Sequence, residues 1–179
     1  MNILLHICCA NCAIYPVKVL REQNHRLTGY FFNHNIHPYQ EFRRRLETVR
    51  EYAEKVELSV ITKEDYLLEE FLSKVAASPR DRCDYCYRSR LEDTARTAAE
   101  QGFEAFSTTL LYSRYQNHEI IRAFAQELET HFGVRFHYED FRTGWREGIE
   151  TSRAMGLYRQ QYCGCIYSEK ERYCPRSRN

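Results

Sequence analysis

Short apolar runs alternate with helical segments along this chain, and this alternation limits the possible folds more than any other feature. Residues typical of strands occupy the runs 2–7, 26–32, 56–61, 104–111 and 134–140. Helical segments lie between them, at 13–23, 41–56, 87–101 and 117–133. Parallel neighbours in a sheet need a crossover connection, so the pattern predicts an α/β fold with a parallel sheet and helices on both faces.

We expect a single core. The chain has 179 residues, enough for one sizeable α/β domain, and no stretch rich in Gly, Pro or Ser divides it. Residues 1–168 are assigned to this α/β domain, and residues 169–179 to a basic C-terminal tail. Sheets of this kind bind ligands at the carboxyl ends of their strands, so residues just after a strand are the first candidates for a site.

Charge and hydropathy exclude several classes of protein. The formal net charge is +1 and 43% of the residues are hydrophobic, which argues against disorder. Clusters of arginine such as 43–45 most often form the solvated face of a helix. No stretch approaches the roughly 18 apolar residues that span a bilayer, and the start of the chain does not look like a secretory signal. We therefore expect a cytoplasmic protein without a membrane partner.

The cysteines occur in groups. Three lie in HICCANC (Cys8, Cys9 and Cys12), two in CDYC (Cys83 and Cys86), two in CGC (Cys163 and Cys165), and Cys174 stands alone. Structural disulfides are rare in the cytosol, so the grouped cysteines indicate a metal or redox site. A lone cysteine such as Cys174 is more typical of a small buried hydrophobic residue.

The first two groups together offer enough thiolates for a four-ligand metal site. A CxxC pair directs two thiolates at one metal in both zinc and iron–sulfur sites. Zinc sites usually repeat two similar turns, whereas the adjacent Cys8 and Cys9 can reach different iron atoms of a cubane. We therefore favour an iron–sulfur cluster over zinc.

The CGC group is a different kind of site. A disulfide between Cys163 and Cys165 would close a very small ring, and strain of that kind makes a disulfide easier to reduce. This favours a reversible dithiol. Two alternatives stay open: thiolate ligands for an additional iron, and a plain tight turn.

Polar residues follow two other predicted strands. They are Asn33, His34, Asn35 and His37 after the second strand, and Thr108, Thr109, Ser113 and Gln116 around the turn after the fourth. Free backbone N–H groups at that turn could hold a phosphate, although Ser113 and Gln116 could equally form a capping box. His6 lies inside an apolar run and is expected to be a core histidine. In segment 117–133, Asn117 is a candidate N-cap and Gly133 a candidate stop.

An ordered set of motifs resembles one known family. HICCANC, NIHPYQEFRRR, RCDYCYRSRL, FSTTLLYSRYQN, YEDFR and YRQQYCGCIYS are similar to the epoxyqueuosine reductase family QueH, over residues 3–168. The chain departs from the family at Asn11 and Arg114, where Pro is common. The resemblance implies a HUP-like (Rossmann-like) fold and an oxidoreductase that reduces the epoxide of epoxyqueuosine, at the wobble position of tRNA, to give queuosine. It also implies a [4Fe–4S] cluster and allows an additional mononuclear iron.

The resemblance assigns roles residue by residue. It makes Cys8, Cys9, Cys83 and Cys86 the cluster ligands, and Cys163 with Cys165 the redox-active pair. Cys12 stays open, as a replacement for one of the four or as a ligand of a second iron with Cys163, Cys165 or Asp140. Asp140 and Tyr162 are also candidate proton donors. Candidates to hold an anticodon base and its phosphates are Tyr112, Tyr115, Tyr158, Arg88, Arg90 and Arg159.

The implied partners are tRNA carrying epoxyqueuosine and an electron donor. We expect no ATP, because HICCANC stands where ATP pyrophosphatases of this fold carry an SGGxDS-type loop. Two other functions remain as alternatives. One is an ATP-dependent tRNA sulfur-transfer enzyme with a cluster on the same fold, and the other is a zinc-stabilised RNA-binding module.

Overall fold

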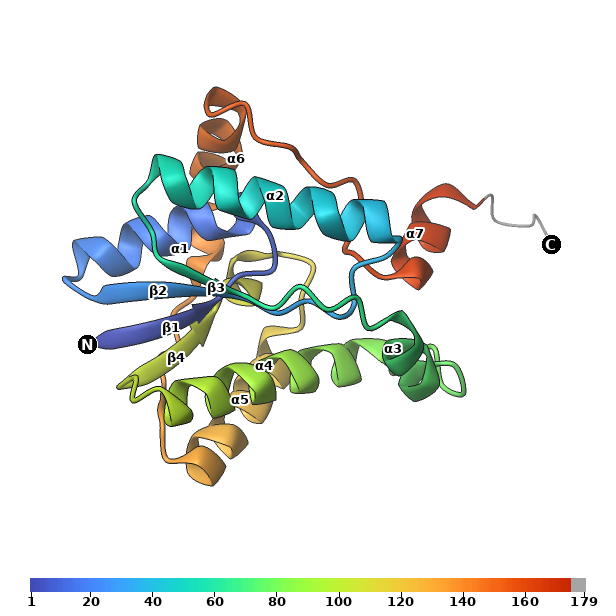
Figure 1. Cartoon of the computed structure of the whole chain (residues 1–179), viewed down its shortest axis with the longest axis horizontal. Coiled ribbons are helices and arrows are strands. Elements are labelled where there is room, and N and C mark those ends of the chain that lie inside the picture. The colour runs from blue at the N-terminus through green and yellow to red at the C-terminus, as the bar shows by residue number, and fades with distance from the viewer. Residues whose placement is uncertain (175–179) are drawn as a thin grey trace.

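Five parallel strands form a central sheet with helices on both faces (Figure 1). The computed structural model describes residues 1–174. The strands are β1 (Asn2–His6), β2 (Arg26–Phe31), β3 (Val60–Thr62), β4 (Ala105–Thr108) and β5 (Arg135–Phe136). Their order across the sheet is β3-β2-β1-β4-β5, and every pairing is parallel. This doubly wound order confirms the α/β, HUP-like fold class.

The helices form two layers. Helices α1 (Ala10–Glu22), α2 (Tyr39–Lys55) and α6 (Trp145–Ala154) cover one face, and α4 (Arg82–Glu100) and α5 (His118–Phe132) cover the other (Figure 1). Shorter elements are α3 (Leu68–Val75), α7 (Ile166–Tyr173) and the 3-10 helices η1 (Thr109–Tyr112) and η2 (Phe141–Gly144). In Figure 1, α3 and α7 lie on the side toward which the carboxyl ends of the strands point.

The hydrophobic core forms on both faces of β1. Ile3, Leu4 and Leu5 are fully buried, although successive side chains of a strand point to opposite faces. This is the burial expected of a central strand in a sheet covered on both sides. From α2, Phe42 and Leu46 pack into the same core, which confirms the apolar stripe predicted for that helix.

His6 at the end of β1 is a core histidine, as predicted. Its Nδ1 lies 2.9 Å from Thr108 Oγ1, and its Nε2 lies 3.2 Å from the carbonyl oxygen of Phe32. Burial lowers the pKa of His6 to about 4, so the ring is neutral at physiological pH. Its ring therefore joins three strands of the sheet at their carboxyl ends.

Both predicted ends of α5 are confirmed. Asn117 Oδ1 accepts a hydrogen bond from the Ile120 N–H at 3.2 Å, and Gly133 ends the helix at a φ of 68°. Because Asn117 is the N-cap, Ser113 and Gln116 do not form the capping box that was one alternative for them.

Other boundaries differ from the prediction. The fourth strand ends at Thr108, because the Thr108 side chain accepts a hydrogen bond from the Leu110 N–H and turns the chain into η1. The third strand begins only at Val60, because α2 continues to Lys55 and Glu57 adopts a positive φ of 51°. Helices α1 and α4 both begin earlier than predicted, which places both CxxC groups at helix N-termini.

Residues 169–173 of the expected C-terminal tail are helical, and Cys174, which was expected to be buried, is exposed. Helix α7 begins at Ile166 and ends at Tyr173, so it crosses the predicted boundary at residue 168, and residues 175–179 lie outside the described residues. No helix within residues 1–174 is long and apolar enough to cross a membrane.

Candidate functional site

The first cysteine group follows the central strand. Cys8 lies two residues after β1, and its backbone N–H donates to Thr109 Oγ1, in η1, at 3.1 Å. Thr109 Oγ1 also lies 3.3 Å from Cys8 Sγ. Thr109, at the start of η1 just after β4, therefore holds the Cys8 backbone and thiol in place.

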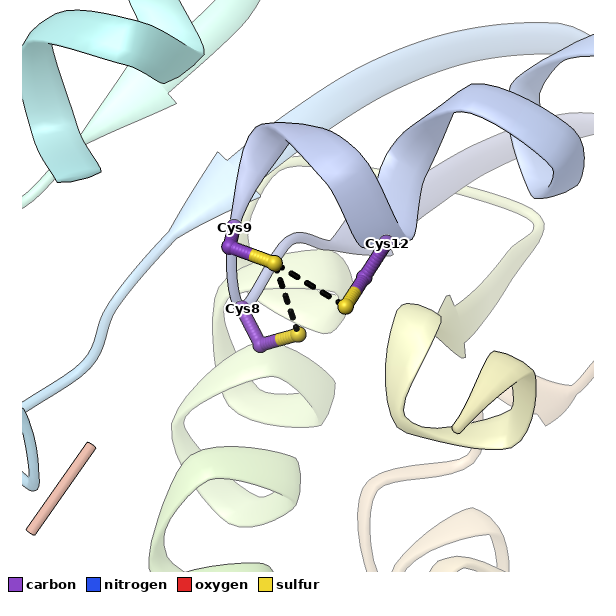
Figure 2. A group of neighbouring side chains, drawn as sticks. All are labelled: Cys8, Cys9 and Cys12. Atoms are coloured by element: carbon purple, nitrogen blue, oxygen red, sulfur yellow. Dashed lines mark hydrogen bonds between the residues drawn. The ribbon is translucent and has the colours of Figure 1, made fainter. Parts of the chain in front are cut away.

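The sulfur atoms of Cys8, Cys9 and Cys12 meet at the start of α1. All three lie within 4.8 Å of one another, with Cys9 Sγ 2.9 Å from Cys12 Sγ (Figure 2). They form the only such group of three candidate metal ligands among residues 1–174. Within the group, the hydrogen bond with Cys12 lowers the pKa of Cys8 and raises that of Cys12, while burial raises the pKa of Cys9, so Cys8 is the thiol that most readily becomes a thiolate. This arrangement can bind a metal.

The other cysteine groups meet around a smaller cavity of about 180 Å³. Its lining includes Cys83 and Cys86 from the first turns of α4, together with Cys163 and Cys165. Cys165 is the N-cap of α7, where its Sγ accepts a hydrogen bond from the Ser168 N–H at 3.4 Å. Burial raises the pKa of Cys86 to about 12. The structure thus places the four predicted cluster ligands in two pairs.

A larger cavity of about 680 Å³ adjoins the smaller one. Cys8 and Cys12 line the larger cavity, and Cys163, Arg90 and Gln116 line both. The Gln116 side chain accepts a hydrogen bond from the Tyr87 hydroxyl at 2.9 Å, and its amide nitrogen lies 3.7 Å from Cys163 Sγ. The two cysteine-lined cavities therefore share one wall.

Arg90 is a buried cation between the cysteine groups. Its side chain is 2% exposed, and it donates to the Cys86 carbonyl oxygen and the Cys86 sulfur, both at 2.9 Å. No carboxylate within the described chain lies at ion-pair distance from it. A buried charge needs a compensating partner, so this site suits anionic sulfur ligands. The donor set and the unpaired cation fit an anionic cluster ligated by thiolates.

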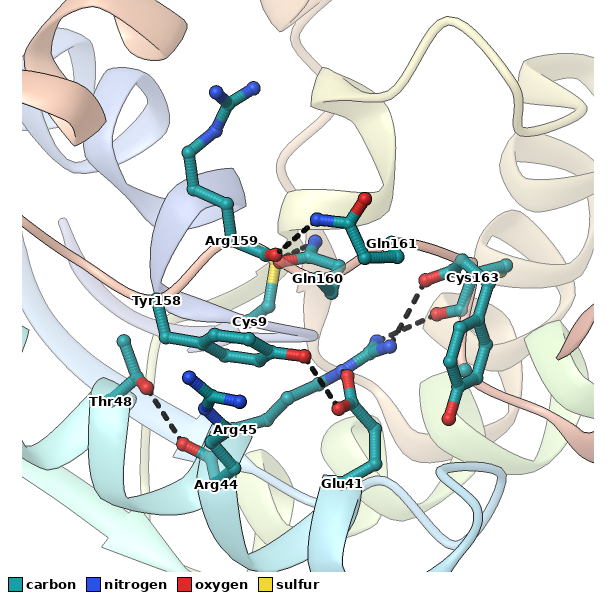
Figure 3. A network of polar contacts seen from close by, with 12 residues as sticks. Cys9, Glu41, Arg44, Arg45, Thr48, Tyr158, Arg159, Gln160, Gln161 and Cys163 are labelled. Carbon is teal, nitrogen blue, oxygen red and sulfur yellow. Dashed lines mark hydrogen bonds and ion pairs between the residues drawn. The ribbon is translucent and has the colours of Figure 1, made fainter. Parts of the chain in front are cut away.

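A second buried arginine, Arg45, fixes the CGC turn. From α2 it donates to the carbonyl oxygens of Cys163 at 2.8 Å and Tyr162 at 3.0 Å, while its Nε donates to Glu41 at 2.6 Å (Figure 3). Gly164 has a φ of 153°, and an added Cβ there would lie 3.3 Å from Arg45 Nη1. The turn therefore needs glycine between its cysteines. Sequence reasoning missed Arg45, because a run of three arginines is typical of a solvated helix face.

An amide network supports the first cysteine group. Gln160 Nε2 donates to Cys9 Sγ at 2.8 Å (Figure 3). Gln160 Oε1 accepts a hydrogen bond from Asn11 Nδ2 at 2.7 Å. Asn11 Nδ2 also donates to the Tyr158 carbonyl oxygen at 2.9 Å, and Ser152 donates to Asn11 Oδ1. The network was not predicted. Its one signal in the sequence was the polar Asn11 where the resembling family commonly has Pro.

The residues after β2 connect the segments that carry the cysteines. Asn33, His34, Asn35 and His37 are all buried. Burial lowers the pKa of His34 to about 3 and that of His37 to about 4, so both rings are neutral. His34 Nε2 lies 3.1 Å from Ser89 Oγ in α4, and His37 Nδ1 lies 3.4 Å from the Ile166 N in α7. These histidines tie together the segments that carry the cysteines.

The predicted substrate residues divide into two sets. Ser113, Gln116 and Arg159 line the larger cavity. Thr108 and Thr109 line neither cavity; Thr108 is fully buried and is bonded to His6 and to the Leu110 N–H. The two threonines therefore position neighbouring residues, Thr108 the His6 ring and Thr109 the Cys8 backbone.

The structure does not bring Asp140 to the cysteines. It lines neither cavity, because it follows the edge strand β5, two strands away from β1. Its side chain caps η2 and pairs with Arg142 at 2.5 Å, which holds the pKa of the carboxyl below its usual range. Tyr162 does line the larger cavity, and its hydroxyl donates to the His37 carbonyl oxygen at 2.5 Å.

Comparison with known proteins decides the family. The family model described as epoxyqueuosine reductase QueH matches residues 3–171. The chain belongs to the QueH family. It is 40% identical to the epoxyqueuosine reductase QueH of Dehalococcoides mccartyi over 172 residues. This aligned region covers 96% of this chain and 94% of that protein. It is 35% identical over 182 residues to the QueH of Thermotoga maritima, covering 96% and 92% of the two chains.

A solved structure supports the fold of this QueH family member. It is the crystal structure of a predicted subunit of tRNA methyltransferase from Methanocaldococcus jannaschii, with a TM-score of 0.55 and 12% sequence identity. The match covers 84% of this chain and 74% of that one. At this identity the likeness concerns the fold alone.

Proposed function

We propose that this chain reduces the epoxide of epoxyqueuosine, at the wobble position of tRNA, to the cyclopentene of queuosine, as a cytoplasmic oxidoreductase. Membership of the QueH family supports the reaction. The geometric observation that carries the proposal is the meeting of the grouped thiols at two cavities that share Cys163 and Arg90.

The cofactor in this proposal is a [4Fe–4S] cluster held by Cys8, Cys9, Cys83 and Cys86. Cys9 caps α1, and Cys83 and Cys86 lie in the first turns of α4. Burial raises the pKa of all three thiols, so bound iron would be what holds them as thiolates. Arg90 supplies a positive charge to the set. When bound, the cluster would supply electrons one at a time. Cys12 remains beside this set, and its place in the larger cavity with Cys163 suits a ligand of an additional mononuclear iron.

The electron pair in this proposal comes from Cys163 and Cys165. Conversion of an epoxide to an alkene consumes two electrons and two protons and releases the oxygen as water. Oxidation of a dithiol to a disulfide supplies both electrons and both protons, so the step balances. Cys163 is exposed at the wall of both cavities, and Cys165 is the buried N-cap of α7. An external electron donor then restores the dithiol.

The larger cavity is the proposed substrate site. Its volume of about 680 Å³ lies within the range typical of sites for small molecules and suits a flipped nucleoside. Ser113, Gln116 and Arg159 offer polar contacts on its wall, and Cys163 is close to Gln116. Asp140 lines neither cavity, so this scheme gives it no part.

The two alternative functions can be separated from this one by simple assays. A tRNA sulfur-transfer enzyme of this fold would hydrolyse ATP, and it would bind ATP after β1, where this chain carries its cysteines. A zinc-stabilised RNA-binding module would contain stoichiometric zinc without iron or sulfide. Anaerobic purification followed by iron, sulfide and zinc analysis tests the cofactor, and we expect iron and sulfide.

The function is tested by anaerobic incubation of the iron-loaded protein with tRNA carrying epoxyqueuosine and a strong reductant. Nucleoside analysis of the digested tRNA is expected to reveal queuosine, formed without added ATP. An iron-loaded sample that leaves all the epoxyqueuosine unchanged would reject the proposed reaction. Formation of queuosine only when ATP is present would reject the ATP-independent mechanism.

A further inference from the structure

An aromatic platform stands at the rim of the larger cavity. Trp145, the only tryptophan of the chain, stacks on Tyr112 with ring centroids 5.2 Å apart and an interplanar angle of 29°. Tyr115 meets the same indole edge-on, with centroids 5.8 Å apart. All three rings line the cavity. The Arg114 guanidinium lies 5.7 Å from the centre of the Trp145 ring.

The lower part of this platform is built into the fold. Tyr112 is 3% exposed, and its hydroxyl donates to the Trp145 carbonyl oxygen at 3.0 Å. A Cβ added at Gly148 would lie 2.2 Å from the Tyr112 hydroxyl oxygen, so glycine leaves room for this ring under α6. The indole is therefore held in place by close packing.

Tyr115 is the free member of the platform. It is 84% exposed, and no residue in the described part of the chain bonds to its hydroxyl, yet it lines both cavities. Tyr158, another candidate for stacking, is already engaged, because the Arg44 guanidinium lies 3.7 Å from its ring centre and its hydroxyl donates to Glu41. An exposed aromatic ring beside a cavity is a surface for a flat ligand.

The charge around the cavity selects an anionic ligand. Among the described residues, the lining of the larger cavity contains no Asp or Glu, and it contains Arg159 and Arg172 besides Arg45, which pairs with Glu41, and Arg90, which is assigned to the cluster. A cleft lined by one sign of charge attracts the opposite sign. Aromatic rings beside a cationic groove are the combination that binds single-stranded nucleic acid by base stacking.

We propose that Tyr115, braced by Trp145, is a stacking site for an unpaired RNA base that neighbours the substrate nucleotide. This inference rests on the proposed function, in which the modified nucleoside enters the larger cavity. The adjacent base of the same RNA loop then stacks on Tyr115, and Arg114 faces the RNA strand beside that base. Recognition by stacking accepts any base, because every base has a flat π face.

The binding test uses iron-loaded protein under anaerobic conditions and a fluorophore-labelled, unmodified anticodon stem–loop RNA. Tyr115→Ala is expected to weaken binding about 5- to 150-fold, the range that stacking of one base gives. Tyr115→Phe keeps the ring and is expected to bind like the original chain. Tyr138→Ala is the matched control, because Tyr138 is 37% exposed beside Arg122 but lines neither cavity. Unchanged absorbance of the cluster confirms that each variant is folded and loaded.

A second arm shows that a base is the ligand of Tyr115. An RNA with an abasic site next to the wobble nucleotide is expected to bind the original chain more weakly than the intact RNA does. The Tyr115→Ala variant is expected to bind the abasic RNA and the intact RNA equally well. Additive losses would overturn the proposal, as would intact RNA binding Tyr115→Ala like the original chain. If Tyr115→Ala keeps its RNA affinity and loses turnover only when a protein is the electron donor, the proposal is overturned and the aromatic platform is instead a binding site for that donor protein.

These outcomes are separate from the test of the proposed function. The binding assay uses unmodified RNA and no reductant, so it does not depend on epoxide reduction. Formation of queuosine by a chain whose Tyr115→Ala variant binds RNA normally would support the reaction and reject the stacking site.

Discussion

Replacing Arg90 by methionine should affect the cluster-loaded protein and the metal-free protein differently. Arg90 is 2% exposed and, within residues 1–174, has no carboxylate partner. Exchange of a poorly compensated buried charge for an apolar side chain of similar length is often neutral or stabilising, by about 1–4 kcal/mol. We therefore expect the free energy of unfolding of metal-free Arg90→Met to be unchanged or higher.

The cluster-loaded form contains the thiolate that Arg90 compensates. Arg90 Nη2 lies 2.9 Å from Cys86 Sγ. Two unit charges about 4 Å apart attract by about 4 kcal/mol at an effective dielectric constant of about 20. The burial cost of the guanidinium is common to both forms and cancels in the comparison. The substitution should therefore cost the loaded form about 4 kcal/mol more than the metal-free form, by the same estimate.

Urea unfolding under anaerobic conditions measures this difference, with chelator-treated and reconstituted samples of each variant. Arg90→Lys keeps the charge and is the matched control, for which we expect a smaller difference between the two forms. Equal destabilisation of both forms by Arg90→Met would refute the reasoning. It would mean that Arg90 acts only through its hydrogen bond to the Cys86 carbonyl oxygen.

Three further predictions concern the site and the core. Cys83→Ala should abolish the cluster absorbance near roughly 400 nm, whereas Cys163→Ser should keep that absorbance and stop queuosine formation, as measured by nucleoside analysis. Gly164→Ala should slow turnover and keep the cluster, because its Cβ would press on Asn35 Nδ2 at 3.2 Å. Below pH 6.5 the free energy of unfolding should fall, because His6 in the unfolded chain binds a proton that His6 in the folded chain binds only near pH 4. The contribution of His6 to this loss at pH 4 is about 3 kcal/mol.

Each of these predictions has a contradicting result. Loss of iron from Cys163→Ser would favour the second-iron role over the dithiol. Full turnover by Gly164→Ala would show that the CGC turn tolerates a side chain. For the pH dependence, His6→Asn is the control, and an unchanged slope of the urea midpoint against pH in that variant would assign the effect to other groups.

The fold was predictable because its signals are local and repeated. Alternation of strand and helix signals indicated a parallel sheet, and the helix start at Asn117 followed from its side chain alone. No helical spacing of apolar residues in the sequence indicated the early start of α4. Its first turns carry Cys86, Tyr87 and Arg90, which are buried by contacts with distant segments.

The site was predictable in its cysteines and less so in their surroundings. Grouping in the sequence identified the thiols, and their positions after β1 and at helix starts agree with that interpretation. The roles of Arg45 and Gln160 depend on contacts across more than a hundred residues, which no local pattern reports. That Asp140 lines neither cavity could not be foreseen for the same reason, because closeness to a strand end does not reveal which strand is central.

A single-turnover experiment tests the central claim most directly. The iron-loaded protein is reduced anaerobically, separated from the reductant, and mixed with excess tRNA carrying epoxyqueuosine. We expect queuosine in proportion to the protein, with oxidation of Cys163 and Cys165 to a disulfide, because that dithiol holds the electron pair that one epoxide consumes. Unchanged epoxyqueuosine, with both thiols still reduced in an iron-loaded sample, would contradict the account.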